Sequence, residues 1–215
     1  AAPEHDKLTP LLSLPLAFGT VLENIPAQVP YLRAPEPRIA RWAALLGKRT
    51  RPRIGLAWWG SQHIARRSMA IAALVPMLRL PGLEFHALQK EIPPSDQDWL
   101  AAHALVTDHS AGLEDFADTA ALIAQMDLVI SIDTSVAHLA GALGKPVWIM
   151  LPFSPDWRWL RDREDSPWYP TARLFRQTRR GDWDDVVRRV LEALSVERFQ
   201  YQIEGDQHGV VAAHQ

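Results

Sequence analysis

Three polar residues, Asp133, Thr134 and Ser135, separate an apolar run from an Ala- and Leu-rich segment, and His138 follows one helical turn later. Asp, Thr and Ser are the residue types that most often cap the N-terminus of a helix. The first N–H groups of a helix have no partners within it and attract anions, and the helix dipole adds to this attraction. The four residues therefore predict an anion site, with His138 as a further contact.

The neighbouring segments must position this site. Residues 128–132 form an apolar, β-branched run typical of a strand buried on both faces, and residues 147–151 form a second one. Between them, residues 136–143 favour a helix that Gly144 ends. Strands joined by such a helix should be parallel, which places the turn at 133–135 at the carboxyl edge of the sheet. Ligands bind at this edge in open α/β sheets.

Strands and helices alternate along the rest of the chain. Further strands are expected at 53–59, 83–88, 105–107 and 172–175, and further helices at 37–46, 69–80, 99–104, 113–126 and 181–194. Asp118 is the expected N-cap within the fourth of these helices, and Asp182 is the expected N-cap of the last. This alternation predicts an α/β fold with a Rossmann-like, doubly wound parallel sheet.

Polar residues also follow the first two strands, at the same edge of the predicted sheet. They are Gly60, Ser61, Arg66 and Arg67 after the first strand, and Gln89 and Lys90 after the second. Arginines in a loop after a strand are placed to bind phosphate, although a solvated loop would carry them too. The Pro-, Trp- and Arg-rich stretch 152–180 is either a packed cover over the core or the wall of a ligand site.

Composition limits the function classes. The chain has 215 residues, 47% of them hydrophobic and 22% charged, and a net charge of −2, so it shows no bulk attraction for nucleic acid or membranes. The absence of cysteine excludes disulfides and cysteine–metal sites. No apolar run reaches the length of about 18 residues that a membrane span needs, and we expect a cytoplasmic protein.

Standard catalytic and nucleotide motifs are absent. Neither G-x-G-x-x-G nor G-x-x-x-x-G-K-[ST] occurs, which removes support for a common dinucleotide site or a P-loop. H-E-x-x-H is missing and the eight histidines are scattered, so no metal site is expected. A hydrolase triad of Asp133, Ser135 and His138 would need a nucleophile elbow, and no G-x-S-x-G is present.

The segment from Ser131 to Pro146, S-I-D-T-S-V-A-H-L-A-G-A-L-G-K-P, resembles the C-terminal domain of glycosyltransferase family 9, the lipopolysaccharide heptosyltransferases. It is more similar still to the related transferase domains that follow tetratricopeptide repeats in bacterial proteins. The stretches 60–68, 88–90, 154–159 and 165–170 support the resemblance, which covers about residues 53–194.

This resemblance implies that the chain is the C-terminal half of a GT-B glycosyltransferase. Residues 1–34 would then be the tail of a preceding, largely absent acceptor-side domain. Residues 35–200 would form the domain that binds the nucleotide-sugar donor, and residues 201–215 a flexible tail.

The resemblance also implies roles for individual residues. The family's Asp-Thr-Gly-x-x-His segment contacts the phosphate and sugar of the donor, which carries over to Asp133, Thr134, Ser135 and His138; Ser135 replaces the family's glycine. The loop with Gly60 and Ser61 supplies a phosphate-binding cation, which Arg66 or Arg67 matches. The remaining donor positions match Gln89 and Lys90 and, near the base, Leu113 and Glu114.

The implied reaction is an inverting transfer from a nucleotide-diphosphate sugar to a saccharide, lipid-linked or protein acceptor. A helix dipole and cations stabilise the leaving diphosphate, so neither a metal nor another cofactor is required. The general base would belong to the preceding domain, so we expect these residues alone to be inactive. Two alternatives stay open: a non-catalytic nucleotide-binding or interaction module, and a sugar-nucleotide epimerase with the same two-domain fold.

Overall fold

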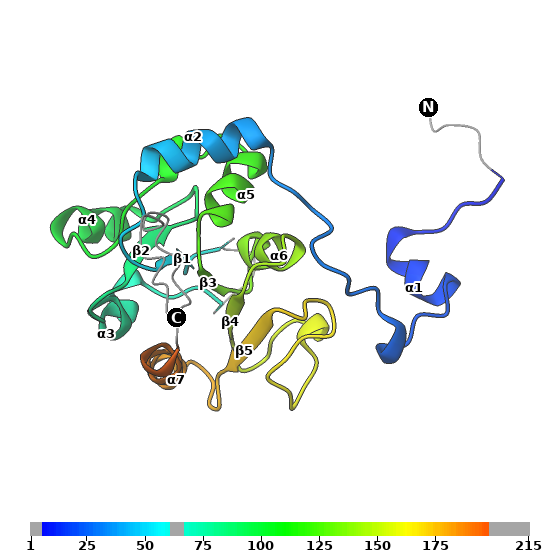
Figure 1. The fold of residues 1–215 in the computed structure, drawn as a ribbon. Helices are drawn as coiled ribbons and strands as arrows, with labels where there is room; N and C mark the ends of the chain where they lie inside the picture. Colours follow the sequence, from blue (N-terminus) through cyan, green and yellow to red (C-terminus); the bar gives the residue numbers. More distant parts are fainter. Residues whose placement is uncertain (1–5, 61–66, 198–215) are drawn as a thin grey trace, which may run out of the picture.

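A single parallel sheet forms the core of the computed structural model, which describes residues 6–60 and 67–197 (Figure 1). Within these residues its strands are β1 (Arg53–Ala57), β2 (Glu84–Ala87), β3 (Leu128–Ile132), β4 (Val147–Leu151) and β5 (Ala172–Arg176). They lie in the order β2-β1-β3-β4-β5, and each neighbouring pair is parallel. The predicted α/β fold with a parallel sheet is therefore confirmed.

Helices cover both faces of the sheet, as the prediction of a doubly wound sheet requires. One face packs against α2 (Glu36–Leu46), α5 (Phe116–Ala124) and α6 (Ser135–Ala142). The other packs against α3 (Val75–Leu78), α4 (Pro94–Ala102) and α7 (Trp183–Val196). In Figure 1, α2 and α5 lie above the strands, and α3 and α7 lie below them. Because each face has a helical cover, β1, β3 and β4 are buried along their whole length.

Most predicted elements differ from the structure by a few residues at their ends, and two helices and one strand differ more. In place of a helix over 69–80, a 3₁₀ turn at Ile71–Leu74 leads into α3, because Pro76 has no N–H and fits only the first turn of an α-helix. α4 likewise begins at Pro94 rather than at 99. The predicted strand at 105–107 is an isolated bridge between Thr107 and His86.

The predicted N-cap of α5 is wrong. Asp115 caps this helix by accepting hydrogen bonds from the N–H groups of Ala117 (2.9 Å) and Asp118 (3.1 Å). Asp118 instead lies in the first turn, where its fully covered carboxylate pairs with Arg38 and Arg41 of α2. Burial would raise the pKa of Asp118, but the bonds from Arg38 and from the backbone and the charge of Arg41 hold it below its ordinary value. Asp118 therefore ties α5 to α2.

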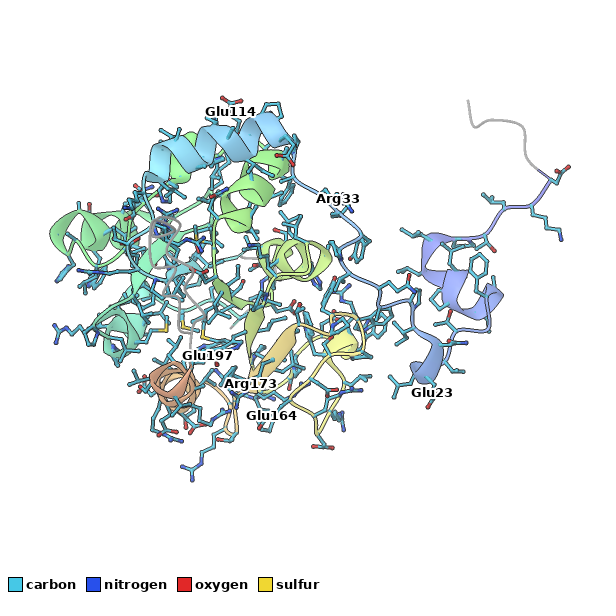
Figure 2. All side chains as sticks on the ribbon, viewed as in Figure 1. Glu23, Arg33, Glu114, Glu164, Arg173 and Glu197 are labelled. Atoms are coloured by element: carbon cyan, nitrogen blue, oxygen red, sulfur yellow. The ribbon has the colours of Figure 1, made fainter. Side chains whose placement is uncertain are left out.

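Residues 6–34 lead away from the sheet toward the N-terminus (Figure 1), with Tyr31 and Leu32 still hydrogen-bonded to the carbonyl of Ala142, and Figure 2 labels Glu23 and Arg33 along this segment. It contains 3₁₀ turns at Leu11–Ser13 and Leu22–Asn24 and the short α1 (Leu14–Ala17). Large apolar side chains stay exposed along it, among them Leu8, Leu11, Leu12, Leu16 and Phe18. The expectation that residues 1–34 end a preceding domain stays a prediction, as do the other domain bounds.

A buried histidine pair links β2 to the loop before α5. His86 Nδ1 lies 3.0 Å from His109 Nε2, and the two rings are stacked. Arg53 and Glu84 face His86 from the neighbouring strand positions, and Asp108 is next to His109. Burial, then His109, then Arg53 lower the pKa of His86 to about 4.

This pair predicts that the protein loses stability in mild acid. The pKa of His86 is lower in the folded state than the value of about 6.5 in an unfolded chain, so the unfolded state binds more protons below that value. The linkage expression gives a free energy of unfolding about 2 kcal/mol lower at pH 5 than at pH 7. Urea titrations at both pH values measure this difference, and most of it should disappear in His86→Phe. An equal loss in wild type and variant would contradict the assignment, and His103→Phe, at an exposed histidine, is the control.

Candidate anion-binding site

The strand order places a switch point between β1 and β3. From β1 the chain runs to β2 on one side and later returns to β3 on the other. The loops that leave β1 and β3 therefore diverge, and they leave a crevice at the carboxyl edge where ligands bind in this class of sheet. After these two strands, the predicted residues that the structure describes lie at this crevice, and two cavities flank it.

The N-terminus of α6 opens into the crevice without a side-chain cap. Thr134 is the N-cap residue by backbone geometry, but it makes no cap bond. Its hydroxyl instead lies 3.1 Å from that of Ser131 in the interior, where Ser131 donates to the carbonyl of Ile132. The N–H groups of Ser135 and Val136 have no partner within the helix. The turn therefore presents free donors and the positive end of a helix dipole to any ligand above it.

Arg67 brings a cation to the same turn. One of its terminal nitrogens donates to the carbonyl of Asp133 at 3.0 Å, while its Nε is buried and has no hydrogen-bond partner among the described residues. Gly60 makes this approach possible, since a Cβ there would lie 3.0 Å from Arg67 Nε and 3.1 Å from Thr134 Cγ2. The guanidinium and the open end of α6 thus face a common space, and both favour an anion.

His138 and Asp133 face each other inside the first cavity, which has a volume of about 500 Å³. His138 Nε2 lies 3.7 Å from Asp133 Oδ1. Burial would raise the pKa of Asp133, but His138, Trp159 and Arg158 outweigh it and hold that pKa below its ordinary value. An ionised carboxylate repels phosphate and accepts hydrogen bonds from hydroxyl groups. Asp133 is therefore suited to a sugar hydroxyl or to orienting His138, and not to the phosphate itself.

The second cavity, of about 380 Å³, lies on the other side of the turn and shares Arg67, Thr134 and Ser135 with the first. Apolar side chains from four segments line it: Trp59, Leu88, Phe116 and Val136. Phe116 begins α5 and is 61% exposed, so its ring is open to a ligand in this cavity. Lys90 stands at its edge and donates to the carbonyl of Glu114 at 2.9 Å.

Some of the predicted site residues serve the site indirectly. Gln89 is 5% exposed, and its amide oxygen accepts from the N–H groups of Trp58 (2.9 Å) and Trp59 (3.0 Å), so it shapes the loop after β1. Leu113 is buried in the core and lines neither cavity. Glu114 meets Lys90 through its backbone, on the side of the molecule shown in Figure 2. Ser61 and Arg66 lie outside the described residues.

The structure adds residues that the motifs did not single out. The loop after β4 contributes Ser154, Pro155, Asp156 and Arg158 to the first cavity. The Trp- and Arg-rich composition of 152–180 was the signal for them. These four positions fit the wall interpretation, whereas the buried Trp159 and Tyr169 of the same stretch fit the packed cover. Further along the same loop, Trp159 and Tyr169 contact the His138 ring.

Metal-binding and membrane-spanning features can be stated for residues 6–60 and 67–197. No group of three or more His, Asp or Glu side chains there is arranged to hold a metal ion. None of the helices in that part of the chain has both the length and the apolar character to cross a bilayer.

Comparison with known proteins supports the resemblance found in the sequence. Residues 109–150 match the model of glycosyltransferase family 9 (heptosyltransferase), and this match includes β3, the turn and α6. Protein FlbA of Caulobacter vibrioides is 32% identical over 181 residues, which make up 80% of this chain and 30% of that protein. The chain therefore spans less than a third of the length of this curated relative.

Two solved structures share the fold. The structure of Escherichia coli ADP-heptose lps heptosyltransferase II matches with a TM-score of 0.57 and 21% sequence identity. The match covers 80% of this chain and 55% of the heptosyltransferase chain. The glycosyl transferase family 9 protein from Veillonella parvula has a TM-score of 0.56 and 13% identity, with coverages of 76% and 52%. The chain thus has the fold of about half of each of these proteins.

Proposed function

Because this chain resembles glycosyltransferase family 9 over residues 109–150, we propose that it is the donor-binding part of a glycosyltransferase that uses a nucleotide-diphosphate sugar. One observation carries the proposal: the uncapped N-terminus of α6 and the guanidinium of Arg67 face one space at the switch point of the sheet. A diphosphate satisfies both groups.

The two cavities suggest where the sugar and the nucleoside of the donor lie on either side of the diphosphate. With the diphosphate above Thr134 and Ser135, the sugar extends into the first cavity, where Asp133 and Arg158 meet its hydroxyl groups. The nucleoside extends into the second cavity, whose apolar wall and exposed Phe116 suit the face of a base. Lys90 stands at the same end.

The proposed chemistry is transfer with inversion at the sugar carbon. The bond from this carbon to the diphosphate oxygen breaks, and an acceptor oxygen that has lost its proton forms the new bond from the opposite side. The negative charge that develops on the leaving diphosphate lies at the positive end of α6 and beside Arg67, which lowers the barrier without a metal ion.

The general base and most of the acceptor surface are proposed to belong to a preceding domain. Among the described residues, the carboxylates of the first cavity are Asp133 and Asp156. Asp133 is next to His138, and Asp156 pairs with Arg158, with Nε 3.1 Å from Oδ1. The pKa of Asp133 is held below its ordinary value, which makes this carboxylate a weak base, and Asp156 is engaged by its ion pair. We therefore propose that this chain binds the donor but does not transfer the sugar by itself.

Calorimetric titration tests the proposal directly. ADP, UDP, GDP and CMP are titrated into the chain in buffer that contains a chelator. We expect saturable binding of at least one diphosphate and competition by inorganic pyrophosphate. Absence of binding by all four nucleotides at millimolar concentration would contradict the proposal.

Turnover separates the proposed transferase from its alternatives. A longer protein that contains this chain should release the nucleoside diphosphate from its donor faster when an acceptor is present. An epimerase would change the donor sugar without an acceptor, and a binding module would leave the donor intact; either result would contradict a transferase.

A further inference from the structure

The ring of His138 is held from two sides by residues of the loop after β4. Trp159, which is fully buried, stacks on the ring with a centroid distance of 5.2 Å and an interplanar angle of 17°. Tyr169 approaches its edge, with the hydroxyl 3.0 Å from His138 Nδ1. The ring is therefore fixed through Nδ1, while Nε2 is left for the cleft, 3.7 Å from Asp133 Oδ1.

Tyr169 is itself buried and closely packed against α6. It is 8% exposed, and its ring lies flat against Gly141 of α6, where a Cβ would be 2.4 Å from Tyr169 Cγ. A side chain of any size at position 141 would displace the tyrosine from the helix. His138 and Gly141 lie one turn apart on α6, so a single helix presents both the histidine and the surface that positions its partner.

A third contact keeps the hydroxyl of Tyr169 in its neutral form. Burial and the neighbouring hydroxyl of Tyr31 raise the pKa of Tyr169 well above its ordinary value. Tyr31 is held in place by its backbone, since the N–H groups of Tyr31 and Leu32 both donate to the carbonyl of Ala142, at 3.0 and 3.2 Å. The hydroxyl of Tyr169 therefore keeps its proton and remains a hydrogen-bond partner for His138.

From this arrangement we infer that Tyr169 is a positioning residue for the donor diphosphate: its hydroxyl fixes the orientation and tautomer of His138 so that Nε2 faces the cleft. The inference rests on the proposed function, because it takes the occupant of the cleft to be a diphosphate. Tyr169 does not line either cavity and acts only through His138. A histidine free to rotate would spend part of its time with the wrong nitrogen toward the ligand.

Two measurements on Tyr169→Phe test the inference. The substitution keeps the ring that packs on Gly141 and removes the hydroxyl alone. Nitrogen-15 NMR of the histidine ring should show one dominant tautomer of His138 in the wild type and a mixture in the variant. The dissociation constant for inorganic pyrophosphate should rise about fivefold, the usual effect of one lost hydrogen bond.

A second variant leaves the hydroxyl in place. Gly141→Ala should displace the Tyr169 ring and produce the same change in the His138 signals. The exposed His103 is an internal control, whose signals should stay unchanged in both variants. Unchanged His138 signals in Tyr169→Phe would overturn the inference, as would a changed tautomer with an unchanged dissociation constant.

Failure of the proposed function would be recognised separately. If the wild-type chain binds neither pyrophosphate nor any of the four nucleotides, the diphosphate site itself is wrong. The NMR measurement still decides whether Tyr169 fixes His138, because it needs no ligand.

Discussion

Replacement of Ser135 by Asp is expected to abolish diphosphate binding and to leave the fold at least as stable as before. Ser135 is exposed at the first position of α6 and lines both cavities. A carboxylate there is attracted by the helix dipole, which stabilises a surface helix by about 0.3–1 kcal/mol. The same carboxylate repels a phosphate about 5 Å away by about 3 kcal/mol per charge pair at an effective dielectric constant of 20, equivalent to a loss in affinity of more than 100-fold.

Ser135→Asn is the matched control, since it has nearly the same shape as Asp and no charge. Calorimetry with pyrophosphate gives the affinity, and thermal unfolding gives the stability. Ser135→Asn should retain most of the affinity. If Ser135→Asp binds pyrophosphate as tightly as Ser135→Asn, the diphosphate does not lie at the end of α6.

Replacement of Arg67 by Ala has the second largest expected effect. The guanidinium is held beside the turn by Asp133, and its Nε is unpaired among the described residues. A hydrogen bond to a charged group contributes about 1.5–3 kcal/mol, so affinity for the bound nucleoside diphosphate should fall by about 10- to 150-fold. The affinity of the wild type should also weaken more steeply with added salt than that of the variant.

Arg79→Ala is the control for this prediction. Arg79 is exposed at the end of α3 and lines neither cavity. Its removal changes the net charge by the same amount but should alter the affinity by less than twofold. Equal losses in the two variants would show that only the net charge matters, and would contradict a specific role for Arg67.

The central strands were predictable because burial on both faces leaves a simple pattern. β3 and β4 have the bounds that their apolar runs predicted, 128–132 and 147–151. Asp182, which was predicted to cap the last helix, caps α7 in the structure. These features depend only on neighbouring residues, which is why the sequence alone indicates them.

Features that depend on distant partners were not predictable. Asp115 and Asp118 are equally good caps by type, and the arginines of α2 that pair with Asp118 are about 80 residues away along the chain. Gln89 lies where it could contact a ligand, but its amide oxygen already accepts hydrogen bonds from backbone N–H groups of the loop after β1. The sequence shows which residues reach the edge of the sheet, but it does not show which of them are already hydrogen-bonded.

In the candidate site, too, the features set by neighbouring residues were predictable and those set by distant partners were not. The turn at 133–135 and Arg67 lie together at the carboxyl edge, as alternation of strands and helices indicated. The inward turn of the Thr134 hydroxyl, which leaves α6 uncapped, depends on Ser131 and appears only in the folded chain. The contact between Tyr169 and His138 was also not predictable, because a loop residue has no periodic sequence pattern that would indicate its partner.

A crystal structure of the chain with a bound nucleoside diphosphate tests the central claim most directly. The account predicts that a phosphate oxygen lies within hydrogen-bonding distance of the N–H groups of Ser135 and Val136, with Arg67 beside it and the base in the cavity that Phe116 lines. A diphosphate bound elsewhere, with the end of α6 empty or in contact with solvent alone, would contradict it.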